Sequence, residues 1–411
     1  MTEHHALWFN ALTTKTSPED VRDRALVSGE GCHVTDAAGR RYLDARSALW
    51  NAGLGYSNTA VADAVRAQLD QLPVAQLIRH DQPPQVSLRY AERLVAVLPE
   101  HLRHVRLCST GSQAVEGAVF LSRFVRILQG DPDRSQVIAQ HDGYHGIGGL
   151  ASAVTGEPEL HELHGPLVPG VHHVRPWDME ELRTALDRIG PGRVTAIILE
   201  PILGTGALEA PPGYLEEVQR LCREHGVHFV VDEVSTGFGR TGTLTVTEEL
   251  GLEPDMLLLS KAISAGYTPL AAIATTAEIL AGALARPDVV FPHGSTADGN
   301  PVSAAAGLAV LDELADGVVL ENVRARGAQL TAGLAALPSV LRVRGRGLML
   351  GVDLELPAEA VAELRLRCRE AGLLVSTAGS TVIVTPPLVI TAADCDELVG
   401  LLAVCLAPVT A

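Results

Sequence analysis

The chain has 411 residues, 47% of them hydrophobic and 20% charged, and carries a formal net charge of −17. Such a length can bury a large core and favours two lobes, and this composition argues against disorder. The acidic balance argues against nucleic acid or an anionic membrane as a partner. The sequence has no signal-peptide pattern, no membrane-length apolar run, and no CxxC pair or metal-ligand spacing among its six cysteines. We therefore expect a soluble, cytoplasmic protein without a metal site.

The N-terminal part of the chain contains strand, loop and helix patterns in turn. Residues 31–44 alternate on both sides of an Asp-Ala-Ala-Gly turn, which predicts a β-hairpin. A glycine-punctuated loop over 47–56 carries Trp50, which could fill the core or line a pocket. Apolar residues at helical spacing predict helices over 61–72 and 86–97.

A turn of small residues follows the next predicted strand. The strand at 105–108 runs into Ser-Thr-Gly-Ser at 109–112, which opens a helix that ends near Leu128. Exposed backbone N–H groups, hydroxyls and the positive end of a helix dipole together favour an anion. The alternative is an ordinary helix cap, because Ser or Thr with a glutamate soon after caps many helices. The pattern is no P-loop, because no Gly-Lys-Ser/Thr follows.

Two acids and one lysine stand at the ends of short apolar runs. Glu200, Asp232 and Lys261 each close or follow such a run, and the intervals between them suit strand–helix–strand units. Parallel strands connected in this way end at one edge of a sheet, where open α/β sheets bind ligands. We therefore expect the three side chains to converge on one site.

Lys261 is unusual in this sequence. Of 32 basic residues only Lys15 and Lys261 are lysine. Lysine, unlike arginine, can lose its proton when desolvated, and a neutral amine is what Schiff-base chemistry with a carbonyl cofactor needs. The alternative is a lysine that extends from a strand end into solvent.

Two further motifs depend on their context. Tyr144 and His145 follow a strand predicted at 137–139, so an aromatic ring and an imidazole stand at another strand end. The segment 237–242 matches GxGxxG, but it begins well beyond the preceding strand and opens no amphipathic helix. We interpret it as a glycine loop and not as a dinucleotide-binding site.

The C-terminal part of the chain predicts a smaller α/β lobe. A loop over 291–301 leads into an alanine-rich helix at 302–314, which offers hydroxyl groups near a helix start. Helices and strands then alternate: a helix at 319–337, a strand around 343–352, a helix at 358–371, a strand at 382–384 and a last helix.

Taken together, these motifs resemble the class III (ω-amino acid type) aminotransferases, which are pyridoxal 5′-phosphate (PLP) enzymes of fold type I. The likeness runs in family order from about residue 31 to 400 and is carried by residues 110–116, 144–146, 200–201, 232–242, 260–262, 293–301 and 344–349. It implies a large domain over 55–310 with a mostly parallel central sheet flanked by helices. It also implies a smaller α/β domain formed by 1–54 and 311–411.

The resemblance implies the catalytic roles. Lys261 would form the Schiff base with PLP and then shuttle the proton between the substrate Cα and the cofactor. Asp232 would pair with the pyridinium nitrogen and keep it protonated, so that the ring withdraws electrons. The reaction would be ping-pong: an amino donor leaves its nitrogen on the cofactor as pyridoxamine 5′-phosphate, and a carbonyl acceptor takes it up.

The resemblance also implies how the cofactor is held. The phosphate would bind at the 109–112 turn, and the ring would lie between an aromatic and an aliphatic side chain. One residue would reach the phosphate of the other subunit, which implies a homodimer with shared active sites. The implied contacts are Gly111 and Ser112 for the phosphate, Tyr144 and Val234 for the ring faces, Thr296 for the partner's phosphate, and Glu200 in addition.

Departures from the family pattern bear on the substrate. Arginines that clamp a carboxylate in many members are replaced here by Ile383 and Ser376. Arg79 is a possible substitute, and with Trp50 it completes our candidate substrate contacts. Ser235 stands where many members have a glutamine near the cofactor. We therefore expect an amine without a flanking carboxylate, or a biosynthetic intermediate. The sequence Gln-Ala-Val-Glu at 113–116, which follows the phosphate turn, and the loop with Trp50 look closest to the diaminopelargonate and ω-transaminase branches.

Two alternatives stay open. The same scaffold supports racemases, aminomutases and decarboxylases that use PLP, and the cofactor chemistry does not separate them. A catalytically silent relative is the second, because fold does not fix function. The presence of Lys261, Asp232 and the phosphate turn argues against the silent relative.

Overall fold

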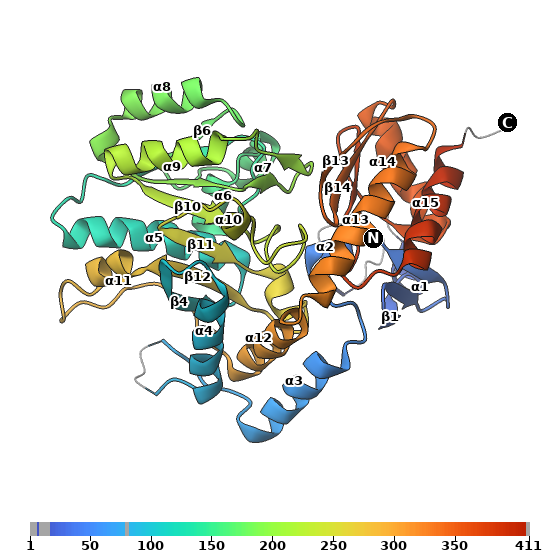
Figure 1. Ribbon diagram of the computed structural model, residues 1–411, viewed down its shortest axis with the longest axis horizontal. Helices are drawn as coiled ribbons and strands as arrows, with labels where there is room; N and C mark the ends of the chain where they lie inside the picture. The colour runs from blue at the N-terminus through green and yellow to red at the C-terminus, as the bar shows by residue number, and fades with distance from the viewer. Residues whose placement is uncertain (1–5, 8–16, 79–81, 408–411) are drawn as a thin grey trace.

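The computed structural model describes residues 6–7, 17–78 and 82–407, and these form two lobes (Figure 1). The larger lobe holds a seven-stranded sheet covered by helices on both faces. The smaller lobe combines the N-terminal strands with the C-terminal helices. No helix in these ranges is long and apolar enough to cross a bilayer.

The central sheet is parallel except for one strand. Strand β12 runs antiparallel to both of its neighbours, and every other pairing joins parallel strands. This arrangement confirms the predicted mostly parallel sheet. In spatial order the strands are β4 (Leu102–Cys108), β12 (Ala271–Thr276), β11 (Met256–Leu259), β10 (His228–Asp232), β7 (Val194–Leu199), β5 (Gln136–Gln140) and β6 (Val171–Val174).

Both faces of this sheet are buried, which explains its continuous apolar runs. Every residue of β7 is buried, with Ile197 and Leu199 in one hydrophobic cluster and Ala196 and Ile198 in another. The first cluster packs under α3 (Thr59–Gln71), α4 (Gln85–Val97), α8 (Met179–Ile189), α9 (Tyr214–His225) and α12 (Pro301–Leu314). The second packs under α5 (Gly111–Leu128), α6 (Gly149–Val154) and α11 (Ala277–Ala283). This part of the chain also contains the short helix α7 (Pro158–His164) and the hairpin of β8 (Ile202–Leu203) and β9 (Leu208–Glu209).

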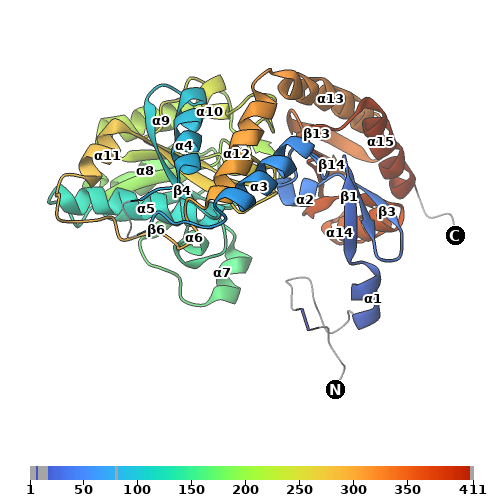
Figure 2. The same cartoon turned by 90° about the horizontal axis from the view of Figure 1, so that it is seen from below.

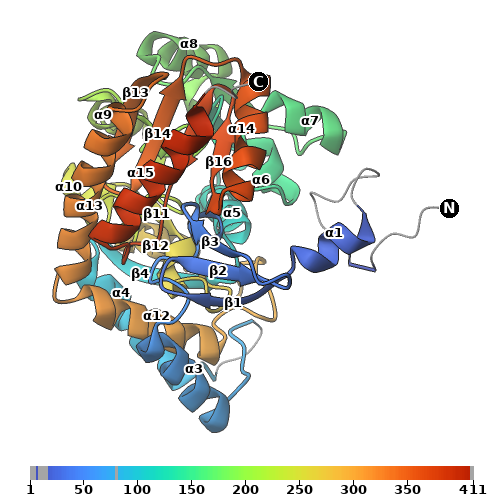
Figure 3. The same cartoon turned by 90° about the vertical axis from the view of Figure 1, so that its right-hand side faces the viewer.

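The smaller lobe brings together the two ends of the chain (Figures 2 and 3). Strand β3 pairs with β15, so Leu43 lies opposite Leu373. One sheet contains β1 (Leu26–Glu30), β2 (His33–Asp36), β3 (Arg41–Asp44) and β15 (Leu373–Leu374), and α1 (Pro18–Asp23) precedes it. The other contains β13 (Val340–Arg346), β14 (Met349–Leu354), β17 (Thr381–Val384) and β16 (Ser376–Ala378). Helices α13 (Val318–Ala335), α14 (Ala358–Glu370) and α15 (Ala392–Leu406) share their core.

Two sequence predictions need correction. The expected single strand around 343–352 is a hairpin of β13 and β14. Its turn uses Gly347, which has a φ of +57° and lies so close to the backbone of Thr241 that a side chain would not fit. The connection between Asp232 and Lys261 is mostly loop, with only the short helix α10 (Val246–Glu249). The expected hairpin at 31–44 is confirmed by β2 and β3.

The buried strand β11 should be critical for stability. Leu258→Ala removes a fully buried side chain and should lower the free energy of unfolding by roughly 2–5 kcal/mol, because a cavity replaces packed atoms. Leu366→Ala is the control, since that leucine is 43% exposed on α14 and should change stability by only about 0.5 kcal/mol. Urea unfolding of both proteins measures the difference. Equal midpoints would contradict the assigned burial of β11.

Candidate active site

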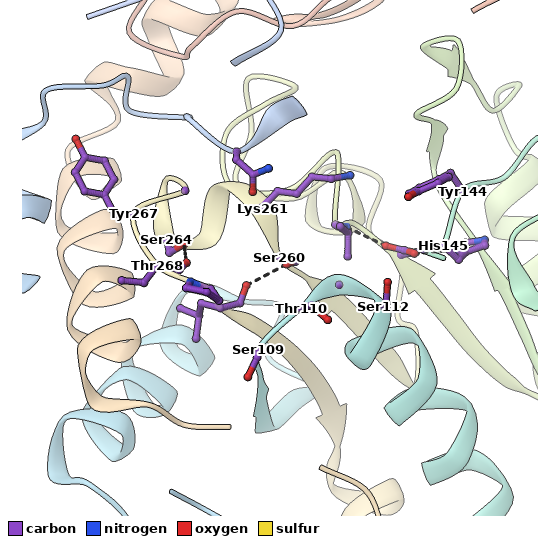
Figure 4. A pocket seen from close by; sticks show the side chains of 18 residues that line it. Ser109, Thr110, Ser112, Tyr144, His145, Ser260, Lys261, Ser264, Tyr267 and Thr268 are labelled. Atoms are coloured by element: carbon purple, nitrogen blue, oxygen red, sulfur yellow. Dashed lines mark hydrogen bonds and ion pairs between the residues drawn. The ribbon is translucent and has the colours of Figure 1, made fainter. Parts of the chain in front are cut away.

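The three residues predicted from strand ends meet at one edge of the central sheet. Strands β7, β10 and β11 are parallel neighbours, and Glu200, Asp232 and Lys261 stand at or just after their carboxyl ends. Beside them lies a cavity of about 420 Å³ (Figure 4). Its walls come from the β4–α5 turn, the Tyr144–Gly146 segment, the end of β10 and residues 260–270.

The start of α5 forms one wall of the cavity. Gly111 and Ser112 line it, so the first turn of an 18-residue helix borders the space. A side chain at position 111 would press against Val234, at 3.1 Å, which explains the glycine. Thr110 caps the helix by accepting from the backbone N–H of Gln113 at 3.2 Å. The cap uses only the N–H of Gln113, so it is compatible with the anion-binding interpretation of this turn.

Lys261 opens a short 3₁₀ turn directly after β11, with a φ of +48°. Its side chain extends toward Tyr144 and His145 (Figure 4). The Nζ donates a 2.6 Å hydrogen bond to Ser235 Oγ and lies 4.8 Å from the centre of the Trp50 ring. Burial lowers the pKa of Lys261, while the charges of Glu200 and Asp232 oppose that change. The Lys261 side chain is partly buried, and the pKa of its amine is shifted in the direction that the sequence interpretation requires.

Asp232 is buried and bound on both carboxylate oxygens. Oδ2 is 2.6 Å from His145 Nδ1, and Oδ1 accepts from the backbone N–H of Val234 at 3.0 Å. Burial lowers the pKa of His145, but the hydrogen bond to Asp232 and the charge of Asp232 outweigh this effect. The pKa of His145 is therefore raised overall.

Glu200 lies behind the cavity wall. Its carboxylate accepts from the backbone N–H groups of Tyr144 at 2.9 Å and Gly204 at 3.1 Å. Burial raises the pKa of Glu200 to about 7, although the charge of His145 opposes this. Glu200 therefore fixes the segment that carries Tyr144 and does not line the space itself.

The structure brings together most of the predicted site residues. Those that line the cavity are Gly111, Ser112, Tyr144, Asp232, Val234 and Lys261. The Trp50 ring lies 4.8 Å from the lysine amine, but Trp50 is not among the residues that line the cavity, so its role as a substrate contact stays a prediction. Thr296 is exposed and lies outside this cavity. Arg79 lies outside the described residues.

Several lining residues were not predicted from the sequence. His145 was seen only as a neighbour of Tyr144, and its position directly after a strand end was the available signal. Ser235 was noted as a departure, but its bond to the lysine depends on the fold. Ser235 itself does not line the cavity. Ser109, Thr110 and Ser260 do, and they belong to motifs noted in the sequence, although none was assigned a role of its own. The remaining lining residues are Asn51, Ser264 and residues 266–270, which come from separate turns and carry no chemical motif.

The family of this chain follows from comparison with known proteins. The profile described as aminotransferase class-III matches residues 16–406, so the chain belongs to the class III aminotransferases. Its members use PLP, and the chain is accordingly a PLP-dependent aminotransferase of fold type I that acts on small-molecule substrates.

Individual relatives span nearly the whole chain. An acetylornithine aminotransferase of Mycobacterium tuberculosis is 37% identical over 385 residues, covering 92% of this chain and 90% of its own. An adenosylmethionine-8-amino-7-oxononanoate aminotransferase of Nitratidesulfovibrio vulgaris is 34% identical, covering 90% of this chain and 75% of its own. An amine transaminase from an uncultivated Pseudomonas species, solved in its PLP-bound form, has a TM-score of 0.91 at 29% identity and covers 98% and 99% of the two chains.

The described residues fit this cofactor. A desolvated amine, a buried carboxylate and the start of a long helix border one cavity, and these match an aldehyde, a pyridine nitrogen and a phosphate, respectively. The apolar Val234 and the ring of Tyr144 line the same space.

The raised pKa of Glu200 predicts a pH-dependent contribution to stability. Between its usual value of 4.5 and about 7, the folded protein holds a proton that the unfolded chain has lost. This contribution therefore falls as pH rises through that window and is constant above it. Glu200→Gln cannot ionise, so its stability relative to the unsubstituted protein should improve as pH rises from about 5 to about 7.5.

Thermal unfolding across that pH range measures this effect. The exposed Glu162→Gln is the control, because it makes the same change in net charge at the surface. A pH-independent difference between the Glu200→Gln and unsubstituted proteins would contradict the raised pKa.

Proposed function

We propose that Lys261 is the catalytic base and the covalent attachment point of the cofactor. When bound, PLP supplies a carbonyl carbon for amine exchange and an electron-withdrawing ring. The single observation that carries the proposal is the Lys261 amine, desolvated and facing Asp232 and the start of α5 across one cavity. Ser235 holds the amine by a 2.6 Å hydrogen bond. The lowered pKa of Lys261 suits an amine that must accept a proton from the substrate Cα.

Asp232 holds the proton of the pyridine nitrogen in this proposal. Its carboxylate is held through both oxygens, by His145 and by the backbone N–H of Val234. His145 is buried and acts through Asp232, so it is a positioning residue.

The phosphate is assigned to Gly111 and Ser112. Both lie in the first turn of α5, where backbone N–H groups have no partner within the helix. Tyr144 and Val234 are assigned to the two faces of the ring. Glu200 is assigned to the cofactor site through its hold on the Tyr144 segment.

The substrate is proposed to be an amine without a flanking carboxylate, processed with a carbonyl acceptor by a ping-pong mechanism. Among the described residues that line the cavity there is no arginine. Ile383 is buried in β17, and Ser376 lies opposite it in β16. The name of the amine transaminase relative supports this class, and that of the acetylornithine aminotransferase supports a biosynthetic intermediate. Arg79 and Trp50 remain our candidate substrate contacts.

The working unit is proposed to be a cytoplasmic homodimer that binds neither nucleic acid nor membrane. Its net charge of −17 supports the last point. Thr296 is exposed in the single protomer. A residue that contacts the phosphate in a partner subunit must be exposed in this way. Nearby, an apolar groove of about 450 Å³ is bordered by the exposed Leu284 and Val290. The two domains are proposed to be 55–310, and 1–54 with 311–411.

Loss of the lysine amine should abolish turnover. Lys261→Ala should lower kcat by about 10²–10⁴-fold or more, because proton transfer alone contributes that much. Lys261→Arg is the matched control: it keeps a positive charge but cannot deprotonate, and it should be equally inactive. Initial rates and circular dichroism of both variants test this. Full activity in either folded variant would contradict the assignment.

An absorption spectrum separates transamination from its rivals. Amines without a carboxylate, added with no acceptor present, should convert the visible band of the PLP form into that of the pyridoxamine form. A carbonyl acceptor should then restore the first band. A band that persists while the amine is racemised, rearranged or decarboxylated would favour the alternative reactions. Conversion by α-amino acids alone would contradict the proposed substrate class.

A further inference from the structure

A left-handed turn lies between the N-terminal hairpin and the active site. Ser47, Ala48, Leu49 and Trp50 have φ values of +41°, +48°, +58° and +64°. Residues other than glycine seldom adopt this conformation even singly, because Cβ meets the carbonyl oxygen. Strain of this kind persists only where the surroundings fix the backbone. The turn ends on Trp50, whose ring contacts the Lys261 amine.

One anchor of the turn lies within the hairpin. Asp44 accepts from the backbone N–H of Ala48 at 2.8 Å through Oδ2 and from that of Arg46 at 3.2 Å through Oδ1. The hydroxyl of Tyr56 donates to Asp44 as well. This buried carboxylate therefore binds the backbone of the turn directly.

The second anchor is Arg240, which is 1% exposed. Its Nη2 donates to Ser47 Oγ at 3.1 Å, and its Nη1 donates to the carbonyls of Leu348 at 3.0 Å and Pro386 at 2.5 Å. Among the described residues Arg240 forms no ion pair, and burial lowers its pKa to about 9. A buried cation without an anion is costly, so its hydrogen bonds must serve the arrangement around it.

Ser47 connects this anchor to the smaller lobe. Its hydroxyl donates to the Thr385 carbonyl at 2.7 Å, while the backbone N–H of Thr385 donates to Ala45 at 2.7 Å. Arg240 comes from the glycine loop 237–242. The sequence analysis rejected a dinucleotide-binding role for this loop and assigned it no other. That loop follows β10, so Arg240 joins the edge that carries Asp232 to the turn that carries Trp50.

We propose that Arg240 is a positioning residue that holds the strained turn 47–50 and thereby sets Trp50 against the Lys261 amine. The inference rests on the proposed role of Lys261. Arg240 does not line the cavity and forms no hydrogen bond with the amine, although its positive charge also lowers the pKa of Lys261. Arg240→Lys keeps that charge, so a change in this variant reports on the turn. A guanidinium suits this position because its planar fork reaches three acceptors in fixed directions, which an ammonium cannot do.

The test uses the full-length enzyme with Trp8 and Trp177 replaced by Phe, so that Trp50 is the only tryptophan. Arg240→Lys and Ser47→Ala should shift Trp50 emission to longer wavelength and increase its quenching by acrylamide, with and without PLP. Both should also lower kcat/KM by about tenfold, as small displacements near reacting groups do. The substrate is an amine without a carboxylate that converts the PLP form in the absorption assay. Arg126→Lys is the matched control, since Arg126 is also buried and donates to a carbonyl, that of Gly226, at 2.7 Å.

The fluorescence readout needs no substrate, so it is independent of the proposed reaction. If Arg240→Lys does not fold, Ser47→Ala decides, because it removes a single hydroxyl. Unchanged Trp50 emission and quenching in folded variants would overturn the proposal, as would changed emission with unaltered kcat/KM. An equal response in Arg126→Lys would also overturn it, since the effect would then come from general loosening.

Discussion

The site depends on the cost of removing one amine from water. Lys261 Nζ is desolvated, and burial alone drives it toward its neutral form, whereas Asp232 and Glu200 favour its charged form. The balance requires that acids stand near the amine without bonding to it. The structure achieves this by giving each acid its own partners: His145 for Asp232 and two backbone N–H groups for Glu200. The amine itself bonds to a neutral hydroxyl, that of Ser235.

That separation follows from the geometry of parallel strands. Neighbouring strands lie about 4.8 Å apart, so groups at the ends of β7, β10 and β11 are close enough to interact electrostatically. Each strand is buried on both faces, and its end is therefore fixed by the core. The three side chains therefore extend from a buried scaffold. Trp50, in contrast, follows the N-terminal hairpin of the smaller lobe. The charged groups around the amine and the aromatic ring beside it therefore come from different parts of the chain.

The sequence predicted the residues at the strand ends well and the turn with Trp50 poorly. Apolar runs that end in Glu200, Asp232 and Lys261 carry a local pattern, and parallel topology converts it into convergence. The hairpin of β13 and β14 was missed because its turn depends on the positive φ of Gly347 against a distant backbone. His145 and Ser235 were undervalued because their partners lie far away in sequence.

The left-handed turn shows why such features escape prediction. Nothing in Ser-Ala-Leu-Trp favours positive φ, since β-carbons oppose it at every residue. Instead, the turn is hydrogen-bonded to Asp44, Arg240 and Thr385, which come from three separate parts of the chain. Local preference and global structure therefore disagree here, and natural sequences place such disagreement mainly at functional sites. The disagreement lies beside the amine, since the turn ends on Trp50, whose ring centre is 4.8 Å from Lys261 Nζ.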